Sequence, residues 1–174
     1  MQERLKTNVF VVHGRDDRAR REMFAFLRAL GLTPIEWSKA VAATEKAAPF
    51  IGEVLEAGFN IAQAVIILLT GDDEAMLKAV YLTDDDPEYE KRLTPQPRPN
   101  VLFEAGMAFA LHPEHTILVE LGKIRPFSDV AGRLAVKLND TSGARNELAQ
   151  RLEDAGCVVN RMGKDWLVEG NFGR

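Results

Sequence analysis

The sequence has few cysteines, no long apolar run and no signal peptide, which argues against disulfide-rich, membrane-spanning and secreted proteins. Its 174 residues include one cysteine, Cys157, which excludes an internal disulfide framework and a cysteine-rich zinc site. This cysteine usage fits a reducing compartment, and we expect a cytoplasmic protein. The longest apolar run, from Ala64 to Leu69, is far shorter than the ~20 residues that a membrane-spanning helix needs. The N-terminus lacks the apolar core and cleavage site of a signal peptide, so we expect no membrane partner and no secretion.

An excess of positive charge is also missing. The chain has 22 Lys and Arg against 26 Asp and Glu, a formal net charge of −4. Because attraction to phosphate backbones requires a positive surface, direct binding of nucleic acid is disfavoured. Hydrophobic residues make up 46% of the chain, which is ordinary for a folded globular protein and argues against disorder. The length favours a single domain, residues 1–174.

Several catalytic motifs are absent as well. The sequence contains no complete dinucleotide or ATP-binding loop, no Gly-x-Ser-x-Gly elbow and no His-Glu-x-x-His. His112 and His115 have no cysteine or carboxylate cluster at metal-ligand spacing, so we expect no metal.

The sequence does contain alternating strand-like and helix-like segments. Strands are expected at 8–12, 33–37, 64–69, 116–121 and 134–138, and helices at 16–30, 49–58, 100–111 and 141–155. The segment 64–69 (AVIILL) is apolar without alternation, which is typical of a strand buried on both faces of a parallel sheet. The pattern predicts an α/β fold with a mostly parallel sheet.

The remaining segments are interpreted by composition. We expect a loop at 38–48, an acidic insertion at 72–90 and a loop with three prolines at 93–99. The tail, 157–174, is interpreted as a last strand or a hairpin.

Parallel sheets bind ligands at the carboxyl ends of their strands, so the loops there are the candidate sites. The turn from His13 to Asp16 follows the first strand and opens a helix, where backbone amides could hold a phosphate. The same turn could be no more than a tight connection, and both interpretations stay open. Trp37 could stack on a ring, or it could be a half-buried core residue.

Glu104 is the residue that stands out. The expected helix 100–111 (NVLFEAGMAFAL) is apolar on every side except at Asn100 and Glu104, and such a helix is normally buried. A buried lone carboxylate is costly unless it is paired or solvated by a cleft. Glu104 is therefore either a hydrogen-bonded structural group or a site residue with a perturbed pKa.

Four stretches together indicate a family: 9–16 (VFVVHGRD), 26–35 (FLRALGLTPI), 65–73 (VIILLTGDD) and 99–106 (PNVLFEAG). Over about 8–156 the chain resembles the predicted nucleotide-binding, TIR-like domain of bacteria. That domain is similar to the TIR effector half of TIR–STING anti-phage proteins. The resemblance implies a flavodoxin-like TIR fold, with a five-stranded parallel sheet flanked by helices, and makes 157–174 a C-terminal extension.

The resemblance also implies an activity, cleavage of NAD+ at the nicotinamide–ribose bond, with Glu104 as the catalytic glutamate. NAD+ would be the substrate and no cofactor is implied. The residues implied to bind substrate are His13, Gly14, Arg15, Asp16, Trp37, Ser38, Thr70, Gly71, Asp72, Asp73, Asn100 and Phe103. Two departures stand out: Gly71 replaces a proline that is frequent in the family, and the acidic stretch before Leu93 is unusually charged.

The resemblance further implies self-association through TIR–TIR contacts and a cyclic-nucleotide sensor outside this chain. The ~18 residues after Gly156 are too few for a further domain, so the chain is either an excised effector domain or a stand-alone TIR recruited by a partner. Two other functions stay open: a non-catalytic nucleotide-binding or TIR–TIR assembly module, and an enzyme like the nucleoside deoxyribosyltransferases.

Overall fold

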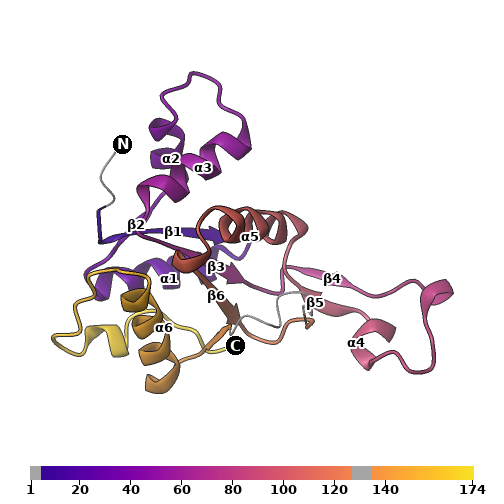
Figure 1. Cartoon of the computed structure of the whole chain (residues 1–174). Coiled ribbons are helices and arrows are strands. Elements are labelled where there is room, and N and C mark those ends of the chain that lie inside the picture. The colour runs from indigo at the N-terminus through magenta and orange to yellow at the C-terminus, as the bar shows by residue number, and fades with distance from the viewer. Residues whose placement is uncertain (1–4, 127–134) are drawn as a thin grey trace.

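Five parallel strands form the centre of the protein, seen in a computed structural model that describes residues 5–126 and 135–174 (Figure 1). They are β1 (Asn8–His13), β2 (Thr33–Ile35), β3 (Ala64–Leu69), β6 (Thr116–Leu121) and β7 (Val136–Leu138), in the order β2-β1-β3-β6-β7. Every neighbouring pair is parallel, which confirms the predicted α/β fold and five-stranded parallel sheet. Leu134, expected to begin the last strand, lies outside the described residues.

The strand order reverses at β1, which lies between β2 and β3. In this strand order ligands bind where the order reverses, at the carboxyl ends of the strands. His13 at the end of β1 lies opposite Leu68 of β3, so the two strands end at the same level. The turns that follow them are therefore neighbours.

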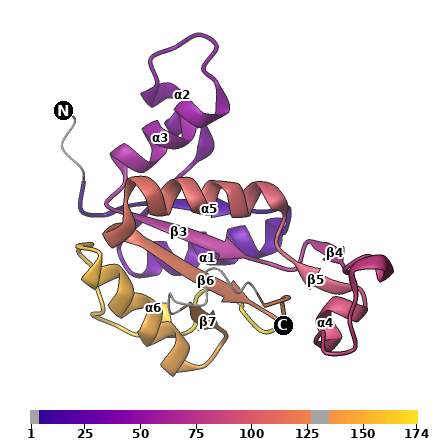
Figure 2. The same cartoon turned by 45° about the vertical axis from the view of Figure 1, so that its right-hand side comes forward.

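Helices cover both faces of the sheet (Figures 1 and 2). On one face α1 (Asp17–Ala29) and α6 (Ser142–Asp154) pack against Val9, Val11 and Ile66. On the other face α3 (Ile51–Ile61) and α5 (Pro99–Leu111) pack against Phe10, Val12 and Ile67. Alternate residues of each strand thus point into two separate cores, as expected of a sheet buried on both sides.

The helix ends predicted for α1 and α6 are confirmed. Asp16 caps α1 by accepting a hydrogen bond from the Ala19 amide at 2.8 Å, and Thr141 caps α6 through the Ala144 amide. Gly31 follows α1 with a φ of +75°, a conformation that favours glycine.

The predicted loop at 38–48 is wrong in its first half, where α2 (Trp37–Ala43) forms. The second strand ends at Ile35, and Trp37 and Ser38 begin this helix rather than ending the strand. Buried Ala40 and half-buried Val41 pack into the core beneath α3. Alanine is the strongest helix former, so Ala40, Ala42 and Ala43 favour this helix locally, and its packing against the core stabilises it further.

Both predicted ends of α3 are also wrong. The helix begins at Ile51 rather than Pro49, because the Phe50 amide donates to the Glu53 carboxylate at 3.0 Å and so satisfies one free N–H of the first turn. It continues past Gly58 to Ile61. A Cβ at Gly58 would lie 2.7 Å from the Phe10 ring, so this glycine lets the helix approach β1 closely.

The acidic insertion forms an arm that projects from the carboxyl edge of the sheet (Figure 1). Its base is an antiparallel pair, β4 (Asp73–Ala75) and β5 (Thr94–Gln96), which corrects the expected loop at 93–99. Between these strands lie a 3₁₀ turn, η1 (Ala79–Tyr81), and α4 (Glu88–Lys91). Arg125 ties the arm to the sheet, since its side chain pairs with Glu90 and its amide donates to the Pro95 carbonyl at 2.6 Å.

The tail forms neither a strand nor a hairpin, contrary to expectation. The tail contains a short 3₁₀ turn, η4 (Asp165–Leu167). Another short 3₁₀ turn, η2 (Pro113–His115), precedes β6. The rings of Trp166 and Phe172 are buried in the core that α1 and α6 cover. Because these two residues are buried, the carbonyl groups of the backbone between them need hydrogen-bond donors.

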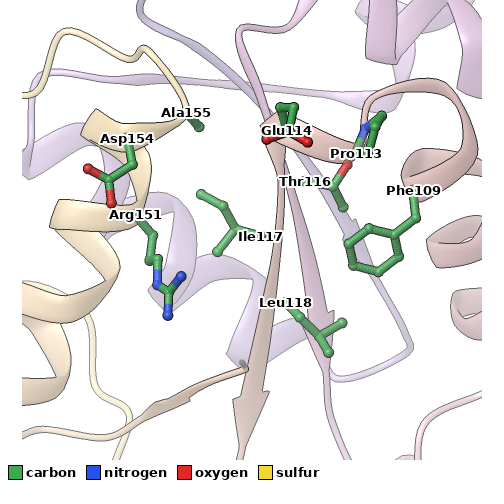
Figure 3. A pocket seen from close by; sticks show the side chains of 9 residues that line it. All are labelled: Phe109, Pro113, Glu114, Thr116, Ile117, Leu118, Arg151, Asp154 and Ala155. Atoms are coloured by element: carbon green, nitrogen blue, oxygen red, sulfur yellow. The ribbon is translucent and has the colours of Figure 1, made fainter. Parts of the chain in front are cut away.

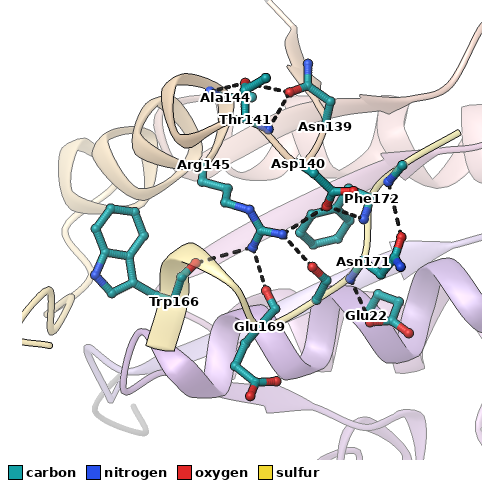
Figure 4. Close-up of polar contacts among 12 residues, drawn as sticks. Glu22, Asn139, Asp140, Thr141, Ala144, Arg145, Trp166, Glu169, Asn171 and Phe172 are labelled. Carbon is teal, nitrogen blue, oxygen red and sulfur yellow. Dashed lines mark hydrogen bonds and ion pairs between the residues drawn. The ribbon is translucent and has the colours of Figure 1, made fainter. Parts of the chain in front are cut away.

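Arg145 of α6 provides those partners (Figure 4). Its side chain is only 2% exposed and donates to the carbonyls of Trp166, Glu169 and Gly170. The guanidinium also pairs with Asp140 at 3.0 Å and lies 5.0 Å from the centre of the Phe172 ring. This buried cation is thus a main anchor of the tail, together with Glu22 and Asp140, which accept from the Asn171 and Phe172 amides.

Arg145→Leu should therefore lower the free energy of unfolding by about 3 kcal/mol, because it leaves buried carbonyls without a donor. Arg151→Leu, which removes a partly exposed arginine 4.0 Å from Glu147, should change it by less than about 0.5 kcal/mol. Urea denaturation of both variants measures this, and equal losses would contradict the assigned role of Arg145.

Within the described residues, no helix has both the length and the apolar character needed to cross a membrane.

Candidate functional site

The turns after β1 and β3 meet through a hydrogen bond between Arg15 and Asp72. The Arg15 backbone N–H donates to Asp72 Oδ2 at 2.5 Å. The contact requires glycine at position 14, because a Cβ there would lie 1.8 Å from the same oxygen. Buried Thr70 directly follows β3, two residues before Asp72. The structure thus brings together Gly14, Arg15 and Asp72, three residues predicted from the sequence to belong to one site.

This contact argues against the turn 13–16 as a phosphate-binding site, because one of its backbone amides is already occupied. The Arg15 amide already holds a carboxylate, which is an anion of the protein itself. Asp16 beside it caps α1 with one oxygen and pairs with Arg174 through the other. Partial burial raises the pKa of Asp16, but the hydrogen bonds from Arg174 and the Ala19 amide outweigh it and hold that pKa below its usual range. Asp16 therefore stays ionised.

Gly71 lies where the arm meets the site. A Cβ at this position would be 2.6 Å from Pro95 Cβ of β5, so a larger residue would push the arm away. The replacement of the family's frequent proline by glycine is thereby explained by the packing of the arm. Arg98, which the sequence analysis did not single out, holds the other side of the arm through an ion pair with Asp73 at 3.3 Å.

Gly14→Ala should cost about 1 kcal/mol of unfolding free energy, because Asp72 must leave the Arg15 amide. In an Asp72→Ala background the same change should cost much less, giving a coupling of about 1 kcal/mol between the two positions. Gly143→Ala is the control, since a Cβ there meets nothing within 4 Å. Additive effects in the double variant, measured by urea denaturation, would contradict this contact.

Helix α5 places Glu104 near these turns. Pro99 is its first residue, and the Arg98–Asp73 ion pair holds the start of the helix beside the β3 turn. Figure 2 shows α5 lying along β3, with its N-terminal end toward the carboxyl end of the strand. Glu104, in the second turn of α5, is thus on the half of the helix nearest the switch point.

The Glu104 carboxyl group is partly buried. Burial raises its pKa to about 7, from an ordinary value near 4.5. Among the described residues, no donor forms a hydrogen bond or an ion pair with this carboxylate. That observation favours the interpretation of Glu104 as a site residue over that of a hydrogen-bonded structural group.

The expectation that α5 is buried all round is wrong. Only Val101, Ala105 and Ala108 are buried, on the side that faces the sheet. Phe103 is 70% exposed, and Asn100 is exposed as well. An outer helix of a three-layer fold buries one side, so the apolar residues on its other side lie at the protein surface.

The remaining predicted residues lie at the same edge of the sheet without direct bonds to Glu104. Trp37, 46% exposed, and Ser38 begin α2 just after β2 ends. The His13 ring stays next to its own turn, with Nδ1 2.9 Å from the Gly14 carbonyl oxygen. No hydrogen bond, ion pair or ring contact between described residues joins any of these three to Glu104.

Two cavities lie away from this edge. One, of about 310 Å³, lies between Phe109 of α5 and Arg151 of α6, above Ile117 near the start of β6 (Figure 3). Another, of about 360 Å³, lies beside α2 and the start of β1. Both are on the side where strands begin, opposite the switch point. Within the described ranges, no group of three His, Cys, Asp or Glu side chains could hold a metal ion.

The raised pKa of Glu104 has a consequence for stability. Between pH 4.5 and about 7, Glu104 is deprotonated in the unfolded chain but still protonated in the folded protein. The free energy of unfolding therefore falls as pH rises through this interval. Glu104→Gln removes the penalty. Its melting temperature should exceed that of the wild type by more at pH 8 than at pH 5, whereas exposed Glu56→Gln should show no such difference. A pH-independent effect of Glu104→Gln, measured by differential scanning calorimetry, would contradict the desolvation of Glu104.

Comparison with known proteins identifies the family. The TIR domain of CAP12/Pycsar effector proteins matches residues 8–140, which include all five strands, the Asp72 turn and Glu104. The chain belongs to this family. The TIR-like resemblance and the fold implied by it are thereby confirmed. The chain is also 30% identical over 154 residues to Escherichia coli (strain K12) "Uncharacterized protein YuaY". That alignment covers 88% of the chain but 47% of YuaY, so the chain spans about half the length of this relative.

Proposed function

We propose that this TIR domain is an NAD+ glycohydrolase that cleaves the nicotinamide–ribose bond and serves as an effector of anti-phage defence. The observation that supports the proposal most directly is the partly buried Glu104 carboxyl group, which has no hydrogen-bond or ion-pair partner among the described residues and lies on the half of α5 nearest the switch point. Membership of the CAP12/Pycsar effector family supports the effector role.

The chemistry requires little more than one carboxylate. Nicotinamide leaves as a neutral molecule when the bond breaks, taking the electron pair, so no strong acid is needed. The ribose carbon then carries oxocarbenium character, which a nearby anion stabilises. Water adds to this carbon and loses a proton, giving ADP-ribose. In this scheme the Glu104 carboxylate contacts the ribose and stabilises the positive charge that develops there.

The turns at the sheet edge would hold the rest of the substrate. Arg15 has an exposed side chain beside the Asp72 contact, where it can meet the diphosphate. Exposed Trp37 offers an aromatic face for a ring of NAD+. We assign His13, Gly14, Asp16, Ser38, Thr70, Gly71, Asp73, Asn100 and Phe103 to the same binding region.

Assembly is part of the proposal. Exposed Phe103, beside Glu104 on α5, leaves the candidate site bordered by apolar surface that a second TIR domain can cover. We propose that self-association completes the site and that a sensor of cyclic nucleotides, within a longer chain or in a partner protein, triggers it. The proposed setting is the cytoplasm, where NAD+ is available.

The test is nicotinamide release from NAD+ by concentrated protein, with and without a crowding agent. Wild-type protein should release nicotinamide, and Glu104→Gln should lower the rate at least about 100-fold, as removal of a key electrostatic group does. Glu56→Gln, an exposed glutamate on α3, should match the wild type. Equal release by wild type and Glu104→Gln would contradict the role of Glu104.

Two other outcomes would indicate the alternative functions. NAD+ binding that persists in Glu104→Ala, without turnover in a demonstrated assembly, would indicate a nucleotide-binding or assembly module. A covalent sugar adduct on Glu104, detected by mass spectrometry with nucleoside substrates, would indicate an enzyme like the deoxyribosyltransferases.

The rate should also depend on pH in a defined direction. The active form of Glu104 in this scheme is the carboxylate, so kcat/KM should rise with pH up to about 7 and then level off. A rate that falls over this range would indicate that protonated Glu104 acts as a general acid.

A further inference from the structure

A third cavity opens at the carboxyl ends of β6 and β7, beside the tail. Its volume is about 490 Å³, within the usual range of small-ligand pockets. Figures 1 and 2 both show the C-terminus beside the end of β6. The cavity is at the sheet edge where parallel α/β folds bind ligands, but at strands other than those that carry the candidate NAD+ site.

Three cationic side chains line this cavity, and one of them, Arg174, also pairs with Asp16. Lys123 follows β6, Lys137 lies on β7, and Arg174 ends the tail. Among the described residues neither lysine forms an ion pair, and both are exposed. In a protein of net charge −4, two lysines without an ion pair to any described residue concentrate positive charge beside Arg174, which attracts an anion.

One carboxylate accompanies these cations. Glu120 of β6 also lines the cavity, and its Cα is paired with that of Lys137 in the parallel ladder. No ion pair joins the two side chains, so Glu120 remains available as a hydrogen-bond acceptor. A ligand that satisfies both kinds of group carries a phosphate for the cations and hydroxyl groups for Glu120.

We infer that this cavity binds a sugar phosphate, or the sugar-phosphate part of a nucleotide, between the ends of β6 and β7. Lys123, Lys137 and Arg174 contact the phosphate, and Glu120 accepts hydrogen bonds from the sugar hydroxyls. The inference does not rest on NAD+ cleavage, since it concerns a different cavity and its test uses no NAD+.

Arg174 links this cavity to the candidate site. Its guanidinium pairs with Asp16, which caps α1 and follows the Arg15 turn. A phosphate in the cavity competes with Asp16 for this arginine. Occupation of the cavity is thereby expected to alter the turn that holds Asp72.

The test is a titration of the 174-residue protein with ribose 5-phosphate and, separately, with inorganic phosphate, followed by amide chemical shifts in NMR. The wild type should bind ribose 5-phosphate with a Kd at or below about 1 mM and should bind inorganic phosphate more weakly. The largest shifts should be at the amides of Gly122 and Asn139, which line the cavity.

Three variants separate the contributions. Lys137→Ala should weaken both ligands at least about tenfold, because it removes a charged contact to phosphate. Glu120→Gln should weaken ribose 5-phosphate and leave inorganic phosphate unchanged or tighter. Lys78→Ala, an exposed lysine on the arm, should change neither.

Two results would overturn the inference. One is the absence of saturable binding of ribose 5-phosphate by the wild type. The other is binding that survives Lys137→Ala with shifts confined to the Arg15 turn, which would place the anion at the other site.

Discussion

The parallel pairing of β1 and β3 is the constraint on which the other features depend. Both strands are buried on both faces, and their register ends them at the same level. The turns that follow must then share one place, where Asp72 of one turn accepts the Arg15 amide of the other. The arm and the start of α5 are attached to this junction through Pro95 and Arg98, so the position of Glu104 is set by the same pairing.

Glu104 illustrates how a fold can raise the energy of one group without an opposing charge. Its pKa rises because water is displaced, while the described part of the chain gives it no donor. Structural carboxylates in this protein behave differently. Asp140 accepts the Phe172 amide and pairs with Arg145, which outweighs partial burial and lowers its pKa. The contrast between these two carboxyl groups supports a chemical rather than a structural role for Glu104.

The sequence predicted those features that depend on local pattern. The apolar run of β3, the capping residues Asp16 and Thr141, and the lone carboxylate of α5 are each visible in a few neighbouring residues. Contacts between distant segments could not be predicted in this way. The arm forms by pairing of 73–75 with 94–96, and Arg145 bonds to a tail more than twenty residues away. The Asp72 contact was similarly invisible, although both of its turns were identified.

The proposed role of Glu104 depends on burial of its carboxyl group without a donor among the described residues. The most direct measurement is an NMR pH titration of the Glu104 side-chain carboxyl carbon in the wild type, assigned by comparison with Glu104→Gln. We expect a titration midpoint near pH 7, well above the ordinary value of 4.5 for a glutamate. A midpoint near 4.5 would show that the carboxyl group is solvated like a surface glutamate, and it would contradict this role.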